Sequence, residues 1–80
     1  MEEATGEAGW YVLVKQTPRQ SFDRVFYQAI GPFSTRDAAV VQGRGYAASD
    51  ATARVRVIAA GQAPFAKLVW QYGEAIDLGQ

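Results

Sequence analysis

The order of polar and apolar side chains marks three stretches with the features of strands, in which successive side chains fall on opposite faces. These stretches are residues 10–15 (WYVLVK), 24–30 (RVFYQAI) and 54–59 (RVRVIA). Polar and apolar residues alternate cleanly only in the third, and either face of the second could be core. All three are rich in β-branched and aromatic side chains, which favour strands. In the first stretch Trp10, Val12 and Val14 share one face, and Tyr11 and Leu13 share the other. The pattern therefore predicts three strands.

The connection between the first two strands is short and rich in turn residues. Residues 16–23 include Thr17, Pro18 and Ser21, which suit a turn or loop. Parallel strands need a crossover of about a dozen residues or more, usually a helix. We therefore expect these two strands to form an antiparallel hairpin.

A helix is predicted directly after the second strand. We expect Gly31 and Pro32 to end that strand and Ser34 to cap the helix. Asp37, three residues after Ser34, would act as a weaker form of the capping-box acid, and Phe33 is the apolar residue that often precedes a cap. This junction predicts both the end of the strand and the start of the helix.

Small residues recur at helical spacing beyond the junction and would let the helix lie close to the sheet. The recurring positions are Ala38, Val41, Gly45 and Ala48. A glycine inside a helix costs about 1 kcal/mol relative to alanine. The pattern therefore leaves open a shorter helix that ends at Gly43.

Residues 65–72 fit two patterns. The positions that alternate as in a strand are Ala66, Leu68, Trp70 and Tyr72, and those at helical spacing are Phe65, Leu68, Val69 and Tyr72. Pro64 before the segment and Gly73 after it suit a short helix. The β-propensity of LVWQY favours a strand, which is the interpretation we adopt.

These elements predict a single α+β domain over residues 10–73, with an acidic leader at 1–9 and a loose tail at 74–80. The expected architecture is a small antiparallel or mixed sheet of three to four strands, in the order ββαβ or ββαββ, with one helix on one face. The other face is expected to be uncovered. Uncovered sheet faces are solvated, bind a partner or dimerise.

Composition narrows the chemistry that this domain can perform. The 80 residues include no cysteine and no histidine, which excludes disulfides, thiolate zinc sites and the commonest general base. Eight basic residues balance eight acidic ones, so the chain has no net charge.

The apolar runs are shorter than the roughly 20 residues that cross a bilayer. We expect a cytoplasmic, non-catalytic domain without cofactor, metal or membrane contact, and its alanine and arginine content suits a bacterial or phage protein.

Arginine and aromatic residues in the net-basic middle of the chain and near its end are the candidate binding residues. They are Arg24, Tyr27, Arg54, Arg56 and Trp70. Such residues are enriched at protein interfaces, so we expect a partner protein or a second copy on the uncovered sheet face. The alternative is a nucleic acid whose bases stack on the aromatic rings while arginines contact its phosphates.

One short sequence motif is more specific than these single residue types. Residues 31–39, Gly31 to Ala39, read GPFSTRDAA and join the second strand to the helix. This string resembles the strand-to-helix junction of SPOR domains, small bacterial modules associated with glycan strands of peptidoglycan that lack stem peptides. The resemblance implies peptidoglycan glycan binding as a further alternative.

Overall fold

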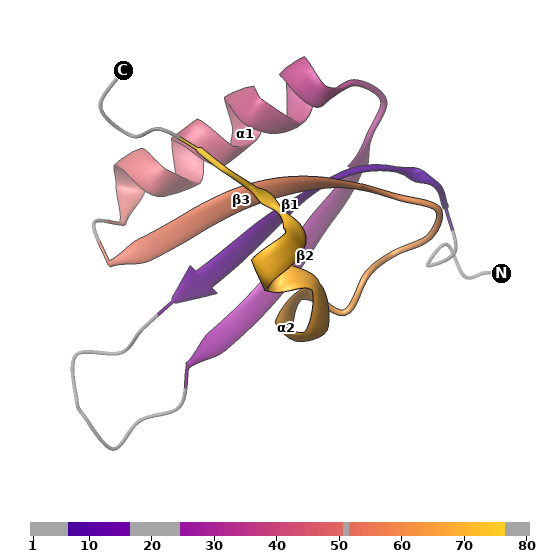
Figure 1. Cartoon of the computed structure of the whole chain (residues 1–80). Helices are drawn as coiled ribbons and strands as arrows, with labels where there is room; N and C mark the ends of the chain where they lie inside the picture. Colours follow the sequence, from indigo (N-terminus) through magenta and orange to yellow (C-terminus); the bar gives the residue numbers. More distant parts are fainter. Residues whose placement is uncertain (1–6, 17–24, 51, 77–80) are drawn as a thin grey trace, which may run out of the picture.

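The chain forms a four-stranded antiparallel sheet with the strand order β2-β1-β3-β4 (Figure 1). The computed structural model describes residues 7–16, 25–50 and 52–76. The elements are β1 (Gly9–Gln16), β2 (Phe26–Phe33), α1 (Arg36–Ser49), β3 (Ala53–Ala60), α2 (Ala66–Val69), the 3₁₀ helix η1 (Trp70–Tyr72) and β4 (Glu74–Ala75). The predicted small α+β fold and the hairpin of the first two strands are confirmed.

β1 is the central strand and is buried on both faces. It pairs with β2 on one edge and with β3 on the other. Val12 and Val14 share one face, as the sequence predicts, and on the side of α1 they join the main core cluster. On the other face Tyr11 is 2% exposed and Leu13 is fully buried. Both faces of the sheet are therefore covered along β1.

α1 packs on the sheet through small residues and continues past the glycine where the sequence allowed it to end. Ala39, Gly43 and Ala47 are its buried positions. A Cβ on Gly43 would lie 2.3 Å from Ile76 Cδ1 and 3.0 Å from Val55 Cγ1. Gly43 is thus a point of close helix-to-sheet contact, and packing offsets its low helix propensity.

The helix cap lies one residue later than predicted. Thr35 is the N-cap, and its Oγ1 accepts a hydrogen bond of 3.1 Å from the backbone N–H of Ala38. The prediction of Ser34 as the cap is therefore wrong. Thr35 has extended backbone angles (φ −135°, ψ 158°), which suit a residue that lies just outside the first turn.

β2 also runs further than predicted, because a bulge carries the chain through Gly31 and Pro32. The register shifts between Trp10 and Val12, so that Trp10 pairs with Phe33 while Val12 pairs with Ile30. Gly31 adopts φ +147°, a region that side chains disfavour. The extra residue is absorbed there, and pairing resumes instead of ending at Ile30.

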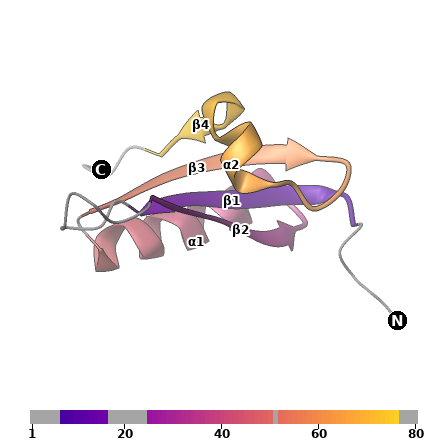
Figure 2. The ribbon, with the colours of Figure 1, turned by 90° about the horizontal axis from the view of Figure 1, so that it is seen from below.

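Residues 65–72 form a helical segment, and the strand interpretation is wrong. The backbone N–H groups of Leu68 and Val69 both donate to the carbonyl of Phe65. α1 and α2 lie on opposite sides of the sheet (Figure 2), and Ala66 is the buried residue of α2. The expectation of an uncovered second face therefore fails over the centre of the sheet, where this segment lies.

The fourth strand comes from the segment that was expected to be a loose tail. In β4, Glu74 pairs with Val57 and Ala75 pairs with Arg56. The N–H of Ile76 donates to the carbonyl of Val55 at 3.1 Å, and the Ile76 side chain packs on the core cluster. The expected tail therefore contributes to the fold at 74–76, and residues 77–80 lie outside the described part.

Candidate functional site

Trp70 is the meeting point of the helical segment and the sheet. Its ring lies 6.2 Å from that of Tyr27, centroid to centroid, in an edge-on arrangement at 66°. The guanidinium carbon of Arg56 lies 5.0 Å from the Trp70 ring centroid, and the Lys15 Nζ lies 5.9 Å from it. Both distances fall within the roughly 6 Å range of cation–π attraction. Trp70 is thus held between two cations and a second aromatic ring.

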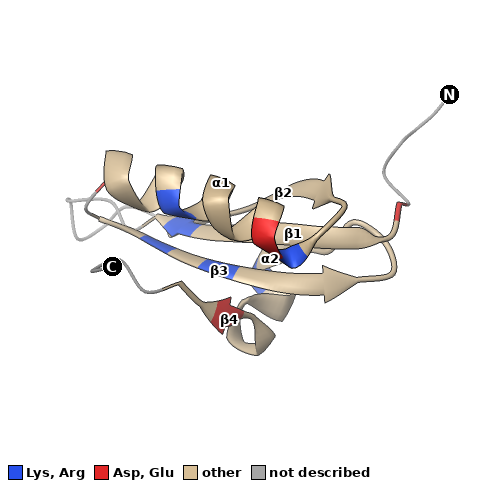
Figure 3. Cartoon of the chain, turned by 90° about the horizontal axis from the view of Figure 1, so that it is seen from above, with Lys and Arg blue, Asp and Glu red and all other residues tan. Residues whose placement is uncertain are grey.

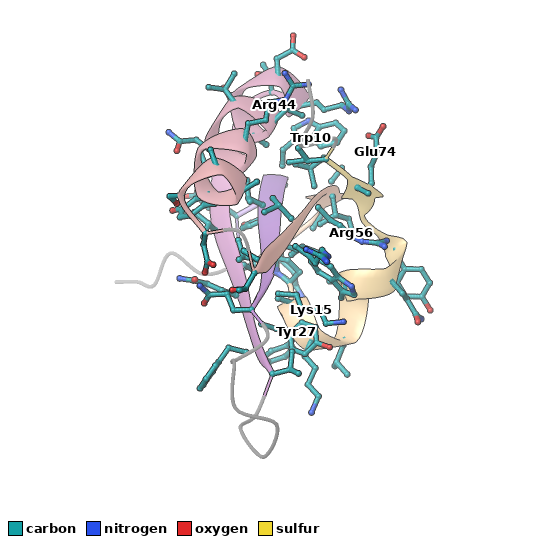
Figure 4. All side chains as sticks on the ribbon, turned by 90° about the vertical axis from the view of Figure 1, so that its left-hand side faces the viewer. Trp10, Lys15, Tyr27, Arg44, Arg56 and Glu74 are labelled. Carbon is teal, nitrogen blue, oxygen red and sulfur yellow. The ribbon has the colours of Figure 1, made fainter. Side chains whose placement is uncertain are left out.

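Sheet pairing explains why these side chains lie together. Lys15 on β1 pairs with Tyr27 on β2 and with Arg54 on β3. Paired residues share a sheet face, and Arg56 lies two residues from Arg54 on the same face. Figure 4 shows Lys15, Tyr27 and Arg56 from the side, with the α2 segment next to them. The site is therefore assembled from three strands and η1.

A groove of about 280 Å³ opens beside Trp70, and we name it the Trp70 groove. Its lining residues are Lys15, Arg54, Val55, Arg56, Trp70, Ala75 and Ile76. Three of them are cations, and no carboxylate is among them. Within residues 7–16, 25–50 and 52–76, none of the three cations forms an ion pair, since Glu74 is bound to Arg36. Counting the described residues alone, the groove therefore carries positive charge without an ion-pair partner.

Arg56 is held in place by backbone carbonyls of η1 and of the residue that follows it. Its Nη1 donates to the carbonyl of Gly73 at 3.0 Å and lies 3.4 Å from that of Gln71. A Cβ on Gly73 would lie 2.9 Å from the Cβ of Arg56, so this close approach requires glycine. A guanidinium has five N–H donors, and those on Nε and Nη2 have no partner among the described residues. Arg56 is a fixed cation that retains donors for a ligand.

The structure brings together most, but not all, of the predicted site residues. The structure brings Tyr27, Arg56 and Trp70 into contact, and Arg54 lines the same groove. Arg24 lies outside the described residues. Lys15 was not among the candidates, although its odd number places it on the face of Tyr11 and Leu13. Lys15 lies beside Arg54 because of the register between β1 and β3, and the sequence does not reveal that register.

The helical segment that supplies Trp70 to the groove also exposes apolar side chains. Phe65 is 79% exposed, and Leu68 and Tyr72 are each 70% exposed. They are three and four residues apart, the spacing of one helix face. We name these three residues the α2 ridge. Exposed apolar groups that cluster in this way are typical of interaction surfaces.

The described residues provide neither a membrane-spanning helix nor a metal-binding cluster. No helix in the described part of the chain is long and apolar enough to cross a membrane. Among the same residues, no group of three or more His, Cys, Asp or Glu side chains could hold a metal ion.

Comparisons of the chain with protein-family models, curated proteins and solved structures found no match. The resemblance to SPOR domains stays a prediction that rests on residues 31–39.

Proposed function

We infer that this domain is a small, non-catalytic module that binds an acidic segment of a partner protein in the Trp70 groove. The observation that carries this proposal is the gathering of Lys15, Arg54 and Arg56 around one indole without a carboxylate partner among the described residues. Like charges that are held close together repel, and an anionic ligand relieves that repulsion. An acidic ligand is therefore the natural occupant.

A protein fits this site better than a nucleic acid. Single-strand binders present open aromatic rings on which bases stack, whereas Trp70 already contacts Tyr27, Arg56 and Lys15. The chain has no net charge, so its electrostatic field would not draw in a polyanion from a distance. The α2 ridge adds apolar contact area of the kind found at the centre of protein interfaces.

The arrangement also suits binding without chemistry. Arginine forms forked hydrogen bonds with carboxylates, and Arg56 retains donors for them. An exposed ion pair contributes about 0.2–1 kcal/mol, so several pairs together with apolar contacts are needed for useful affinity. The domain offers both within one surface.

The test uses a fluorescent peptide of Glu-Glu-Val-Val repeats, blocked at both ends, and a single-stranded oligonucleotide of similar length. Arg54→Glu should weaken peptide binding at least several-fold. Lys67→Glu is the matched control, because it makes the same change in charge on α2, outside the groove. Equal binding by the two variants would remove the proposal. Tighter binding of the oligonucleotide than of the peptide would favour the nucleic-acid function.

A further inference from the structure

A second cationic groove lies on the other side of β4. It measures about 230 Å³, and its lining residues are Arg36, Val40, Arg44, Val57, Glu74, Ala75 and Ile76. Figure 3 shows basic positions on α1, which supplies Arg36 and Arg44 to this groove, and on β3, whose Arg54 and Arg56 line the Trp70 groove instead. We name this the Arg44 groove. Ala75 and Ile76 line both grooves, so β4 forms the wall between them.

The Arg44 groove holds a partly compensated charge. Glu74 Oε1 accepts from Arg36 Nε at 2.9 Å and lies 2.6 Å from Arg36 Nη2. Arg44, eight residues further along α1, has no ion pair in the described part of the chain. Figure 4 shows Arg44 on α1 and Glu74 on β4 toward the same end of the molecule. Summed over its described lining residues, the charge of this groove is therefore positive as well.

In the described part of the chain, no strand pairs with the outer edge of β4. It is the last strand in the sheet order, and it has two residues, whereas β3 has eight. The N–H of Ile76 points toward β3, where it binds the carbonyl of Val55. Successive residues of a strand direct their backbone groups to opposite edges, so Ala75 directs its N–H and carbonyl outward. This edge can accept another strand.

We propose that the acidic partner segment binds in extended form along β4 as a fifth strand, with its carboxylates entering the Trp70 groove and the Arg44 groove in turn. The proposal rests on the function proposed above. Side chains of a strand alternate between the two sheet faces, and each face beside β4 carries a cationic groove. Backbone hydrogen bonds would supply affinity, and the two grooves would select carboxylates at neighbouring positions.

The opposite edge of the sheet does not offer this recognition. β2 reads FYQAIGPF and carries no charged side chain. β4 carries no cation either, but cations from β1, β3 and α1 line the grooves on both of its faces. Charge complementarity therefore assigns the acidic segment to β4.

The test compares the Glu-Glu-Val-Val peptide, whose four-residue repeat keeps odd and even positions distinct in every repeat register, with two versions that are N-methylated at alternate residues, at either the odd or the even positions. Only every second N–H of an added strand faces the sheet. One methylated version should therefore lose at least tenfold in affinity, and the other should stay close to the parent. Equal binding of the two versions, whether strong or weak, would overturn strand addition.

A second measurement tests the Arg44 groove directly. Arg44→Glu should weaken binding of the unmodified peptide several-fold, whereas Lys67→Glu should leave it near the parent value. If Arg44→Glu behaves as Lys67→Glu does, the two-groove arrangement is wrong.

The two proposals can fail separately. If Arg54→Glu loses binding while both methylated peptides bind equally, the proposed function is retained and only the fifth strand is rejected. No loss in Arg54→Glu would reject the proposed function itself.

Discussion

The guanidinium of Arg56 on β3 lies over the indole of Trp70 on η1, with 5.0 Å between the guanidinium carbon and the ring centroid. Nη1 of the same group donates to the carbonyl of Gly73, directly after η1. One side chain thus joins a strand to a helical segment through both its charge and its hydrogen bonds. Binding and stability are therefore coupled at this position.

Trp70→Ala should lower the free energy of unfolding by about 2 kcal/mol, because it removes a half-buried ring together with its contacts to Tyr27 and Arg56. Urea denaturation followed by circular dichroism measures the change. Tyr72→Ala is the control, because Tyr72 is exposed and should cost less than about 0.5 kcal/mol. Equal losses for the two variants would mean that Trp70 does not anchor the segment.

Arg56→Lys should weaken peptide binding and also lower stability by about 1 kcal/mol. Lysine keeps the charge but has no planar fork, so it cannot contact the carbonyls of Gln71 and Gly73 as arginine does. Anisotropy titration and urea denaturation of one protein sample measure both effects. Unchanged affinity and stability would show that only the charge of Arg56 matters.

Gly43→Ala and Gly45→Ala should change stability in opposite directions. A Cβ on Gly45 meets nothing within 4 Å, so alanine there should stabilise the helix by about 0.5–1 kcal/mol. A Cβ on Gly43 would press on Ile76 and Val55, and overpacking should cost about 1 kcal/mol or more. Thermal or urea unfolding gives both values. Stabilisation by both variants would contradict the close contact at Gly43.

Thr35→Ala should cost about 1 kcal/mol, because it removes the acceptor for the N–H of Ala38. Ser34→Ala should cost less than half as much, because Ser34 is not the cap. The comparison decides between the two adjacent hydroxyl residues by urea denaturation. A larger loss of stability in Ser34→Ala than in Thr35→Ala would show that Ser34, which the sequence suggests, is the N-cap.

The strands of the core could be predicted because their alternation reflects burial. Val12 and Val14 face the helix, and Val55 and Val57 join them from β3. The same reasoning wrongly predicted a strand at residues 65–72, because the α2 ridge is apolar and yet exposed. Apolar residues at regular spacing therefore do not by themselves show that a face is buried.

The candidate site could be predicted only in part. The outward arginines of β3 and the aromatic residues were visible as residue types, but their grouping depends on strand register and on the path of η1. Lys15 enters the site because it pairs with Arg54. β4 has two residues, too few to show any period. Its role in separating two grooves therefore had no signal in the sequence.

The double burial of β1 has a consequence for measurement. Its residues 11–14 are covered on both faces, and both of its edges are paired. Amide protons in such a strand exchange with solvent only when the whole domain opens. Deuterium uptake at these few amides would therefore report the global stability of every variant above, while amides of α2 would report local detachment of the segment that carries Trp70.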